Sequence, residues 1–221
     1  MPYAARRGAE GWRQRASAYL CAALATVLLA SCSSPTEAPV AHGSTVVVLG
    51  DSISAGYGLT PEQSWVAHLG TASGWRMVNG GVSGDTSAQG LARLPALLEE
   101  HRPAVVLILL GGNDFLRKQS LTELRANLSA IAAQSRQAAA RPVLVAVPAP
   151  SIAGAALRSL SDHEVYADLA GDLKVPLVDD AVAGVLSRPE WKLDALHPNA
   201  EGHRELAARV AKKLRTLGML R

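Results

Sequence analysis

Cysteine is scarce in this chain of 221 residues, and both cysteines lie before residue 33. Cys21 is inside an apolar stretch near the N-terminus, and Cys32 directly follows that stretch. The remainder of the chain therefore has no disulfide and no cysteine metal site. Its stability must come from a hydrophobic core, which a chain of this length can build as one domain.

Apolar runs long enough to span a membrane are also missing, since such a span needs about 20 residues. The run at residues 16–30 is shorter, uncharged and preceded by four arginines. These are the proportions of an export signal. The run ends in Leu29-Ala30-Ser31-Cys32, which resembles a bacterial lipobox. We expect residues 1–31 to be a lipoprotein signal peptide and Cys32 to carry lipid; an ordinary signal with a chance cysteine is the alternative.

An excess of one charge sign is absent once this signal is set aside. The chain has 22 basic and 19 acidic residues, and residues 1–31 hold four arginines and one glutamate, which leaves 18 of each sign. The mature protein is therefore near neutral, and its charge gives no reason to expect a nucleic-acid partner. Residues 33–44 are rich in Pro, Ser, Ala and Thr. We expect residues 32–44 to form a lipidated, flexible tether and residues 45–221 one monomeric domain.

Short apolar runs alternate with helical patterns from residue 45 onward. Strands are predicted at residues 45–49, 77–79, 104–110, 143–147 and 175–178. Apolar residues at helical spacing separate them, and Leu206, Val210, Leu214 and Leu217 mark a last helix. Strands that are apolar throughout and alternate with helices indicate a parallel sheet covered on both faces. We expect an α/β fold, a three-layer α/β/α sandwich with about five parallel strands.

Three chemically useful positions closely follow the first three predicted strands. Ser52, in Gly50-Asp51-Ser52, follows the first, Gly84 the second and Asn113 the third. Ligands bind at the carboxyl ends of strands in such sheets, so these positions should share one rim. A serine hydroxyl becomes a useful nucleophile only beside a base. Read alone, Gly-Asp-Ser is a weak signal that occurs by chance more often as a turn with a capping serine.

His197 is the candidate base, in Asp194-Ala-Leu-His197-Pro198-Asn199. A carboxylate three residues before a histidine can accept its Nδ1–H and stabilise the imidazolium form. The backbone N–H groups of Ser52 and Gly84 and the Asn113 amide are candidate donors to an oxyanion. A surface Asp–His pair and simple glycine turns are the alternatives. The other histidines lack partners at metal-ligand spacing, and we expect no metal or cofactor.

Together these segments resemble the SGNH, or GDSL, hydrolases. The four blocks at residues 50–57, 79–87, 110–114 and 194–199 occur in the family's order, and the similarity runs from about residue 46 to 214. The resemblance implies a flavodoxin-like SGNH hydrolase fold and an acyl-enzyme mechanism without metal. It makes Ser52 the nucleophile, His197 the base and Asp194 its orienting partner. Ser52, Gly84 and Asn113 would form the oxyanion hole.

Residues 84–95 are similar to the bacterial thioesterase/lysophospholipase/arylesterase branch of this family. That branch usually carries Pro-x-Asn-Tyr-Gly after the fourth strand, where this chain has Pro148-Ala-Pro-Ser-Ile-Ala-Gly154. The acyl-chain preference of the branch therefore does not transfer. We expect Ile152, Ala153 and Ala155 to line a substrate pocket, with ordinary loop packing as the alternative.

These observations predict a lipid-anchored envelope esterase at the periplasmic face of the outer membrane. Its expected substrates are small carboxylic esters or lysophospholipids, because an envelope enzyme does not meet cytosolic acyl-CoA. A carbohydrate O-acetylesterase with the same machinery and a non-catalytic module that binds acyl or glycan groups are the alternatives. Asp114 and Arg117 follow Asn113 and either brace its loop or form a surface ion pair.

Overall fold

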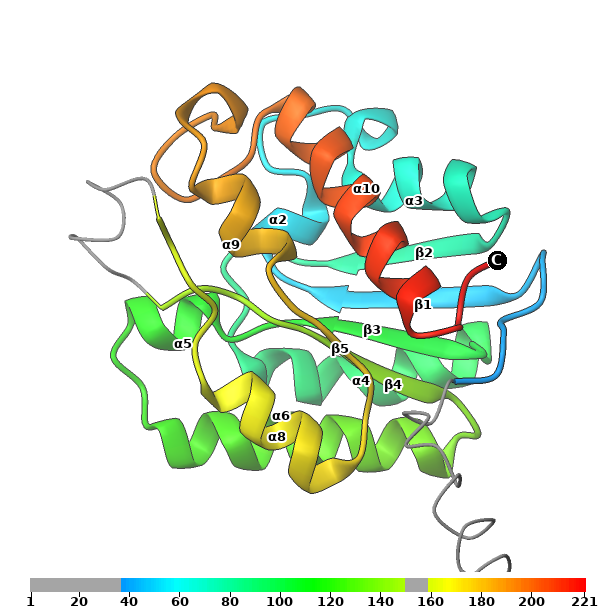
Figure 1. Cartoon of the computed structure of the whole chain (residues 1–221). Helices are drawn as coiled ribbons and strands as arrows, with labels where there is room; N and C mark the ends of the chain where they lie inside the picture. The colour runs from blue at the N-terminus through cyan, green and yellow to red at the C-terminus, as the bar shows by residue number, and fades with distance from the viewer. Residues whose placement is uncertain (1–36, 150–158) are drawn as a thin grey trace, which may run out of the picture. The chain divides into compact units, whose positions relative to one another are not determined.

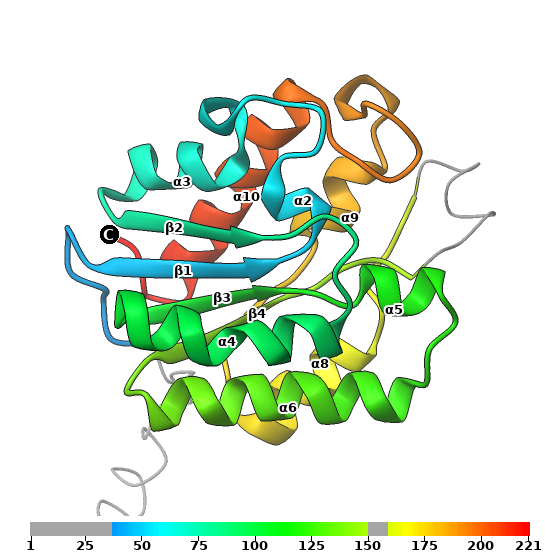
Figure 2. The same cartoon turned by 180° about the vertical axis from the view of Figure 1, so that it is seen from behind.

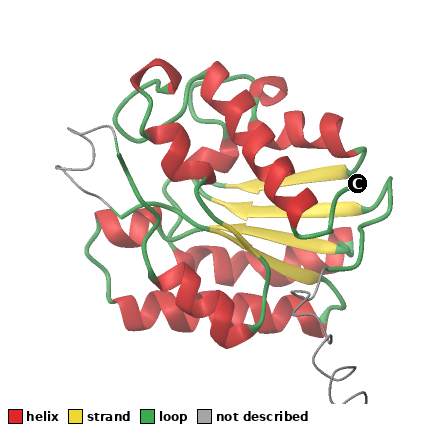
Figure 3. Ribbon diagram, in the orientation of Figure 1, coloured by secondary structure: helices red, strands yellow, loops and turns green. Residues whose placement is uncertain are grey.

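The computed structural model describes residues 37–149 and 159–221. Five parallel strands form one sheet in the order β2-β1-β3-β4-β5 (Figure 1, Figure 3). The strands are β1 (Thr45–Gly50), β2 (Arg76–Gly81), β3 (Val105–Leu109), β4 (Arg141–Val145) and β5 (Leu177–Val178). The helices are α2 (Ser52–Ala55), α3 (Trp65–Ser73), α4 (Ser87–His101), α5 (Gly112–Leu116), α6 (Leu121–Gln137), α8 (Val165–Leu173), α9 (Ala181–Leu186) and α10 (Ala200–Thr216), with short 3₁₀ helices η1 (Pro61–Gln63) and η2 (Pro189–Trp191).

Helices cover both faces of the sheet, which confirms the predicted three-layer sandwich. Helices α3, α9 and α10 lie on one face and α4, α6 and α8 on the other (Figure 1, Figure 2). All residues of β1 and β3 are buried. Trp65 of α3 and the Leu206, Val210 and Leu214 stripe of α10 are fully buried in the same core. Strands of Val and Leu with no polar face are stable only in this doubly covered position.

Strand β1 lies between β2 and β3, with Val48 opposite both Asn79 and Leu107. The chain leaves β1 toward one face of the sheet and leaves β3 toward the other (Figure 1). Open α/β sheets bind ligands where successive connections diverge in this way. The loops after β1, β2 and β3 therefore meet at one carboxyl-end rim.

Two residues that disfavour a helix, Gly90 and Pro95, lie inside α4. A Cβ at Gly90 would stand 2.3 Å from Leu110 Cδ1, so the glycine allows α4 to approach the end of β3. Pro95 lies on the exposed side of the helix. Close packing therefore outweighs the low helix propensity of Gly90.

Residues 37–44 pack against the domain, although the sequence placed them in a flexible tether. The Glu37 N–H donates to Leu217 O at 2.9 Å and the Val40 N–H to Met219 O at 2.8 Å. The compact unit therefore begins by Glu37 rather than at residue 45. The predicted signal peptide and Cys32 lie outside the described residues. Within residues 37–149 and 159–221, no helix has the length and apolarity required to cross a bilayer.

Candidate active site

Ser52 begins α2, directly after the buried strand β1, and is partly exposed at the rim. The preceding Asp51 is 3 % exposed, and its Oδ1 accepts the Ile53 N–H at 3.0 Å. This bond caps the short helix and fixes the turn that presents Ser52. A Cβ at Gly50 would lie 2.1 Å from Ser54 Oγ, so glycine is required where the strand passes into this turn.

His197 lies in the base loop, which we define as residues 192–199, between η2 and α10. The Leu193 N–H donates to His197 O at 2.8 Å, and the Asn199 N–H to Trp191 O at 2.9 Å, so the loop folds back on itself. Asn199 also caps α10, because its side-chain oxygen accepts the Gly202 N–H at 2.9 Å. The start of α10 and the end of η2 thus hold His197 at the rim.

Asp194, His197 and Ser52 form one hydrogen-bonded chain. His197 Nδ1 lies 2.8 Å from Asp194 Oδ2 and 2.9 Å from Oδ1. His197 Nε2 lies 3.0 Å from Ser52 Oγ, although the two residues are 145 positions apart. A carboxylate only accepts hydrogen bonds, so Nδ1 must carry the proton and the unprotonated Nε2 faces the serine hydroxyl. This is the arrangement in which histidine can remove a serine proton.

The pKa values of Asp194 and Asp51 are shifted in opposite directions. Desolvation alone would raise the pKa of Asp194, but hydrogen bonds from the His197 ring and the Leu196 and His197 N–H groups lower it below its usual 3.8. Asp194 therefore stays ionised and can stabilise an imidazolium ion. Burial raises the pKa of Asp51 to about 6, against the opposing effects of the Ile53 N–H and the His197 charge.

The remaining predicted donors lie in two neighbouring loops. Gly84 is in the glycine loop, residues 82–87, and has φ +85°, a conformation that favours glycine. Asn113 is in α5, and its Nδ2 donates to Asp85 O at 3.0 Å, which leaves that nitrogen's second hydrogen available. Because β2 and β3 flank β1, these loops lie on either side of the loop that carries Ser52.

Asp114 and Arg117 brace the glycine loop. Arg117 donates to Gly84 O at 2.7 Å, and Asp114 is buried and accepts two hydrogen bonds from Ser87. Neither residue forms an ion pair in the described part of the chain. Of the two interpretations open from the sequence, the structure supports bracing.

Tyr57 and Ser87 had no role predicted from the sequence. The Tyr57 ring is 51 % exposed and its centroid lies 4.5 Å from that of the His197 imidazole, so it covers the base from one side. Ser87, the last residue of the glycine loop, is completely buried. Tyr57 belongs to the first family block and Ser87 to the second, which is a signal for both residues, but no local pattern marks Ser87 as a contact of Asp114.

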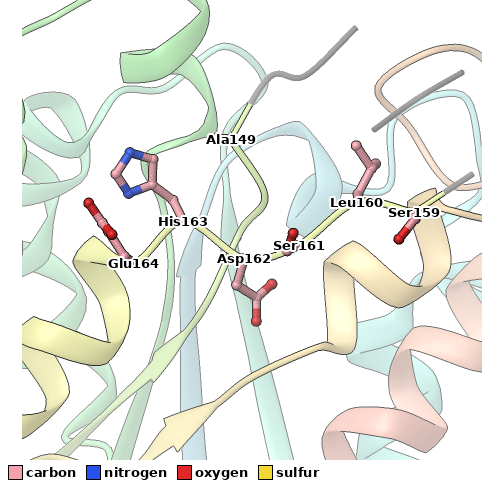
Figure 4. A pocket seen from close by; sticks show the side chains of 7 residues that line it. All are labelled: Ala149, Ser159, Leu160, Ser161, Asp162, His163 and Glu164. Carbon is pink, nitrogen blue, oxygen red and sulfur yellow. The ribbon is translucent and has the colours of Figure 1, made fainter. Parts of the chain in front are cut away.

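A cavity of about 300 Å³ follows β4 (Figure 4), lined by Ala149, Ser159, Leu160, Ser161, Asp162, His163 and Glu164. None of the serine, histidine and aspartate that form the hydrogen-bonded chain lines it. His163 stacks on Phe115 with ring centroids 4.7 Å apart, which joins this region to α5. The predicted pocket residues Ile152, Ala153 and Ala155 lie outside the described residues.

Comparison with known proteins places these features in a family. The sequence model of the GDSL-like Lipase/Acylhydrolase family matches residues 48–205. The chain is 38% identical over 180 residues to "Thioesterase 1/protease 1/lysophospholipase L1" of Escherichia coli K12, covering 80% of this chain and 86% of that protein. It is 37% identical over 177 residues to "Arylesterase" of Vibrio mimicus, covering 76% and 87%.

Solved structures agree with this match. The crystal structure of TesA aligns with a TM-score of 0.70 at 38% identity and covers 78% of this chain and 99% of that one. The psychrotrophic esterase EstA from Pseudoalteromonas sp. aligns with a TM-score of 0.69 at 28% identity and covers 78% and 97%. The family match covers the loops that carry Ser52, Gly84, Asn113 and His197. The chain therefore belongs to the GDSL-like lipase/acylhydrolase family.

Proposed function

We propose that this enzyme hydrolyses carboxylic esters through an acyl-enzyme on Ser52. The observation that carries the proposal is the 3.0 Å contact between His197 Nε2 and Ser52 Oγ, with Nδ1 held by Asp194. Ser52 Oγ attacks the acyl carbonyl carbon while its proton passes to Nε2. The carbonyl oxygen becomes an oxyanion, which the Ser52 and Gly84 N–H groups and the Asn113 amide stabilise.

Collapse of this intermediate breaks the bond to the leaving oxygen, and His197 returns the proton to the departing alcohol. Water then attacks the acyl-serine ester and gives one proton to Nε2. The second collapse releases the carboxylic acid and restores the Ser52 hydroxyl with that proton. Asp194 stays ionised throughout, consistent with its lowered pKa.

Ser52→Ala tests this assignment. We expect turnover of a short p-nitrophenyl ester and labelling by a fluorophosphonate probe to be lost while the thermal unfolding midpoint is retained. Ser129→Ala, on α6, is the control that should keep both. Wild-type turnover in Ser52→Ala would refute the nucleophile, and an unlabelled, inactive wild type would favour the non-catalytic binding module.

Lysophospholipids and other acyl esters are the proposed natural substrates. The names of the E. coli and Vibrio relatives, which include lysophospholipase and arylesterase activities, support this choice. A carbohydrate O-acetylesterase is the alternative on the same residues. Fatty-acid release from lysophosphatidylcholine compared with acetate release from acetylated xylan separates the two; faster acetate release would favour the alternative.

We further propose that lipid on Cys32 anchors the protein in the cell envelope, with the periplasmic face of the outer membrane as the expected location. The lipobox-like sequence before Cys32 supports this. The Glu37 N–H donates to the carbonyl of Leu217, just past the end of α10, whereas the base loop precedes the start of that helix. The chain therefore enters the domain away from Ser52. Labelling with radioactive palmitate should be lost in Cys32→Ala, and an unlabelled, fully soluble wild type would contradict the anchor.

A further inference from the structure

Three contacts join the segment from Asn113 to Arg117 to the glycine loop. Asn113 Nδ2 donates to Asp85 O at 3.0 Å, and Arg117 donates to Gly84 O at 2.7 Å. Between them, Asp114 accepts the Ser87 N–H at 2.9 Å and the Ser87 hydroxyl at 2.5 Å. The two segments that carry Gly84 and Asn113 are thus held together at successive positions.

The Asp114 contact is the buried one of the three. Asp114 is 1 % exposed and Ser87 is 0 % exposed, whereas Arg117 lies at the surface. Asn127 of α6 donates to Ser87 Oγ at 3.0 Å, so the hydrogen bonds run from Asn127 through Ser87 to Asp114. These hydrogen bonds link three elements: α6, the first residue of α4, and α5. A buried carboxylate with these bonds cannot change its partners without a large loss of free energy.

We propose that Asp114 is a positioning residue that, through Ser87, sets the separation between the Gly84 N–H and the Asn113 amide. The inference rests on the proposed function, in which both groups bind the oxyanion. Donors to an oxyanion are effective only when the folded protein already holds them in place. A displacement of about 1 Å at such a site can reduce the rate about a hundredfold.

The charge of Asp114 makes the inference sharply testable. A carboxylate one residue from Asn113 disfavours a negative charge developing nearby, so its removal should, on electrostatic grounds alone, raise kcat. If the role of Asp114 is geometric, Asp114→Asn should instead lower kcat, because the new amide cannot accept both Ser87 bonds with the same geometry. The sign of the change separates the two effects.

The experiment measures kcat and KM for a p-nitrophenyl ester in the full-length enzyme. We expect Asp114→Asn to lower kcat about tenfold to a hundredfold with little change in KM. Inhibition by phenylboronic acid, which forms a tetrahedral adduct with a catalytic serine, should weaken by a similar factor. In an Asn113→Ala background, Asp114→Asn should have a smaller effect than in wild type, because the donor it positions is already absent.

Ser87→Ala is the second variant if Asp114→Asn does not fold, because it keeps the backbone bond to Asp114 and removes only the hydroxyl. We expect a fall in kcat of a few-fold to about tenfold. Ser135→Ala is its matched control, since Ser135 is equally buried but donates to Ile131 O of its own helix. It should keep wild-type kcat.

Several outcomes would overturn the inference while leaving the proposed function intact. One is Ser52-dependent activity with wild-type kcat in both Asp114→Asn and Ser87→Ala. Another is an equal loss with and without Asn113, or a loss of stability with no change in boronate affinity, since Asp114 would then only cap α4. Failure of the proposed function itself would appear as activity that survives Ser52→Ala.

Discussion

The base loop and the glycine loop lie on the same rim but are held in different ways. Hydrogen bonds within a few residues hold the base loop: Asp194 Oδ1 accepts the N–H groups of Leu196 and His197 at 2.8 and 2.9 Å. The glycine loop is held by side chains about 30 residues further along the chain, as in the contact between Ser87 and Asp114. The Asp194 side chain is 46 % exposed, whereas Asp114 is buried.

The difference indicates that the base loop contributes mainly to catalysis, whereas the glycine loop contributes to both catalysis and stability. A base loop made of local bonds at the surface can lose a side chain with little effect on folding. A glycine loop tied to the core by buried polar groups cannot, because each lost partner leaves another buried group unsatisfied. Substitutions of Asp194 and His197 should therefore act mainly on the rate, whereas substitutions of Ser87 and Asp114 should act on both rate and stability.

His197→Ala should give the largest effect on activity. We expect kcat to fall by about 10⁶, the loss measured when the histidine of another serine-hydrolase triad is removed. The free energy of unfolding should change by less than about 1 kcal/mol, because the ring, although only 17 % exposed, makes its hydrogen bonds to Ser52 and Asp194 at the rim. Ester hydrolysis and urea denaturation measure the two quantities. A large loss of stability would break the contrast between the loops.

Asn113→Ala should give a smaller loss of activity. Removing one oxyanion donor typically lowers kcat by about 10² to 10³. The same change removes the hydrogen bond to Asp85 O, so we expect it to lower stability more than His197→Ala does. Comparing the urea midpoints of the two variants checks the order. If His197→Ala were the less stable protein, the division proposed for the two loops would be wrong.

The same contrast explains what could be predicted from the sequence. The pairing of Asp194 with His197 follows from a spacing of three residues, and the position of Ser52 from a buried strand ending in Gly50-Asp51. Gly84 and Asn113 could be assigned to the rim because each follows a predicted strand. The contact between Ser87 and Asp114 could not be predicted, because it depends on how closely α4 packs against Leu110, directly after β3. Gly90 allows that packing, but in the sequence it indicates low helix propensity.

Substitution of Asp51 should have the smallest effect of the three. It tests whether this residue behaves like the exposed base loop or like the buried contacts of the glycine loop. It precedes the nucleophile, yet it is buried like the residues behind the glycine loop. Burial raises its pKa from 3.8 to about 6. Between these two pH values the folded protein keeps a proton on Asp51 that the unfolded chain has released. The stability that this group contributes is therefore complete below about pH 4 and is lost as the pH rises through about 6.

Asp51→Asn should remove this dependence, because asparagine is neutral at both ends of the range and can still accept the Ile53 N–H. Between pH 4 and pH 7 we expect the wild type to lose about 2–3 kcal/mol of unfolding free energy relative to the variant. Urea denaturation at the two pH values measures the difference, and Asp172→Asn serves as the exposed control. If the free energy of unfolding changed equally with pH in wild type and Asp51→Asn, Asp51 would be solvated like the side chains of the base loop. Buried carboxylates at the rim would then be confined to the region of the glycine loop.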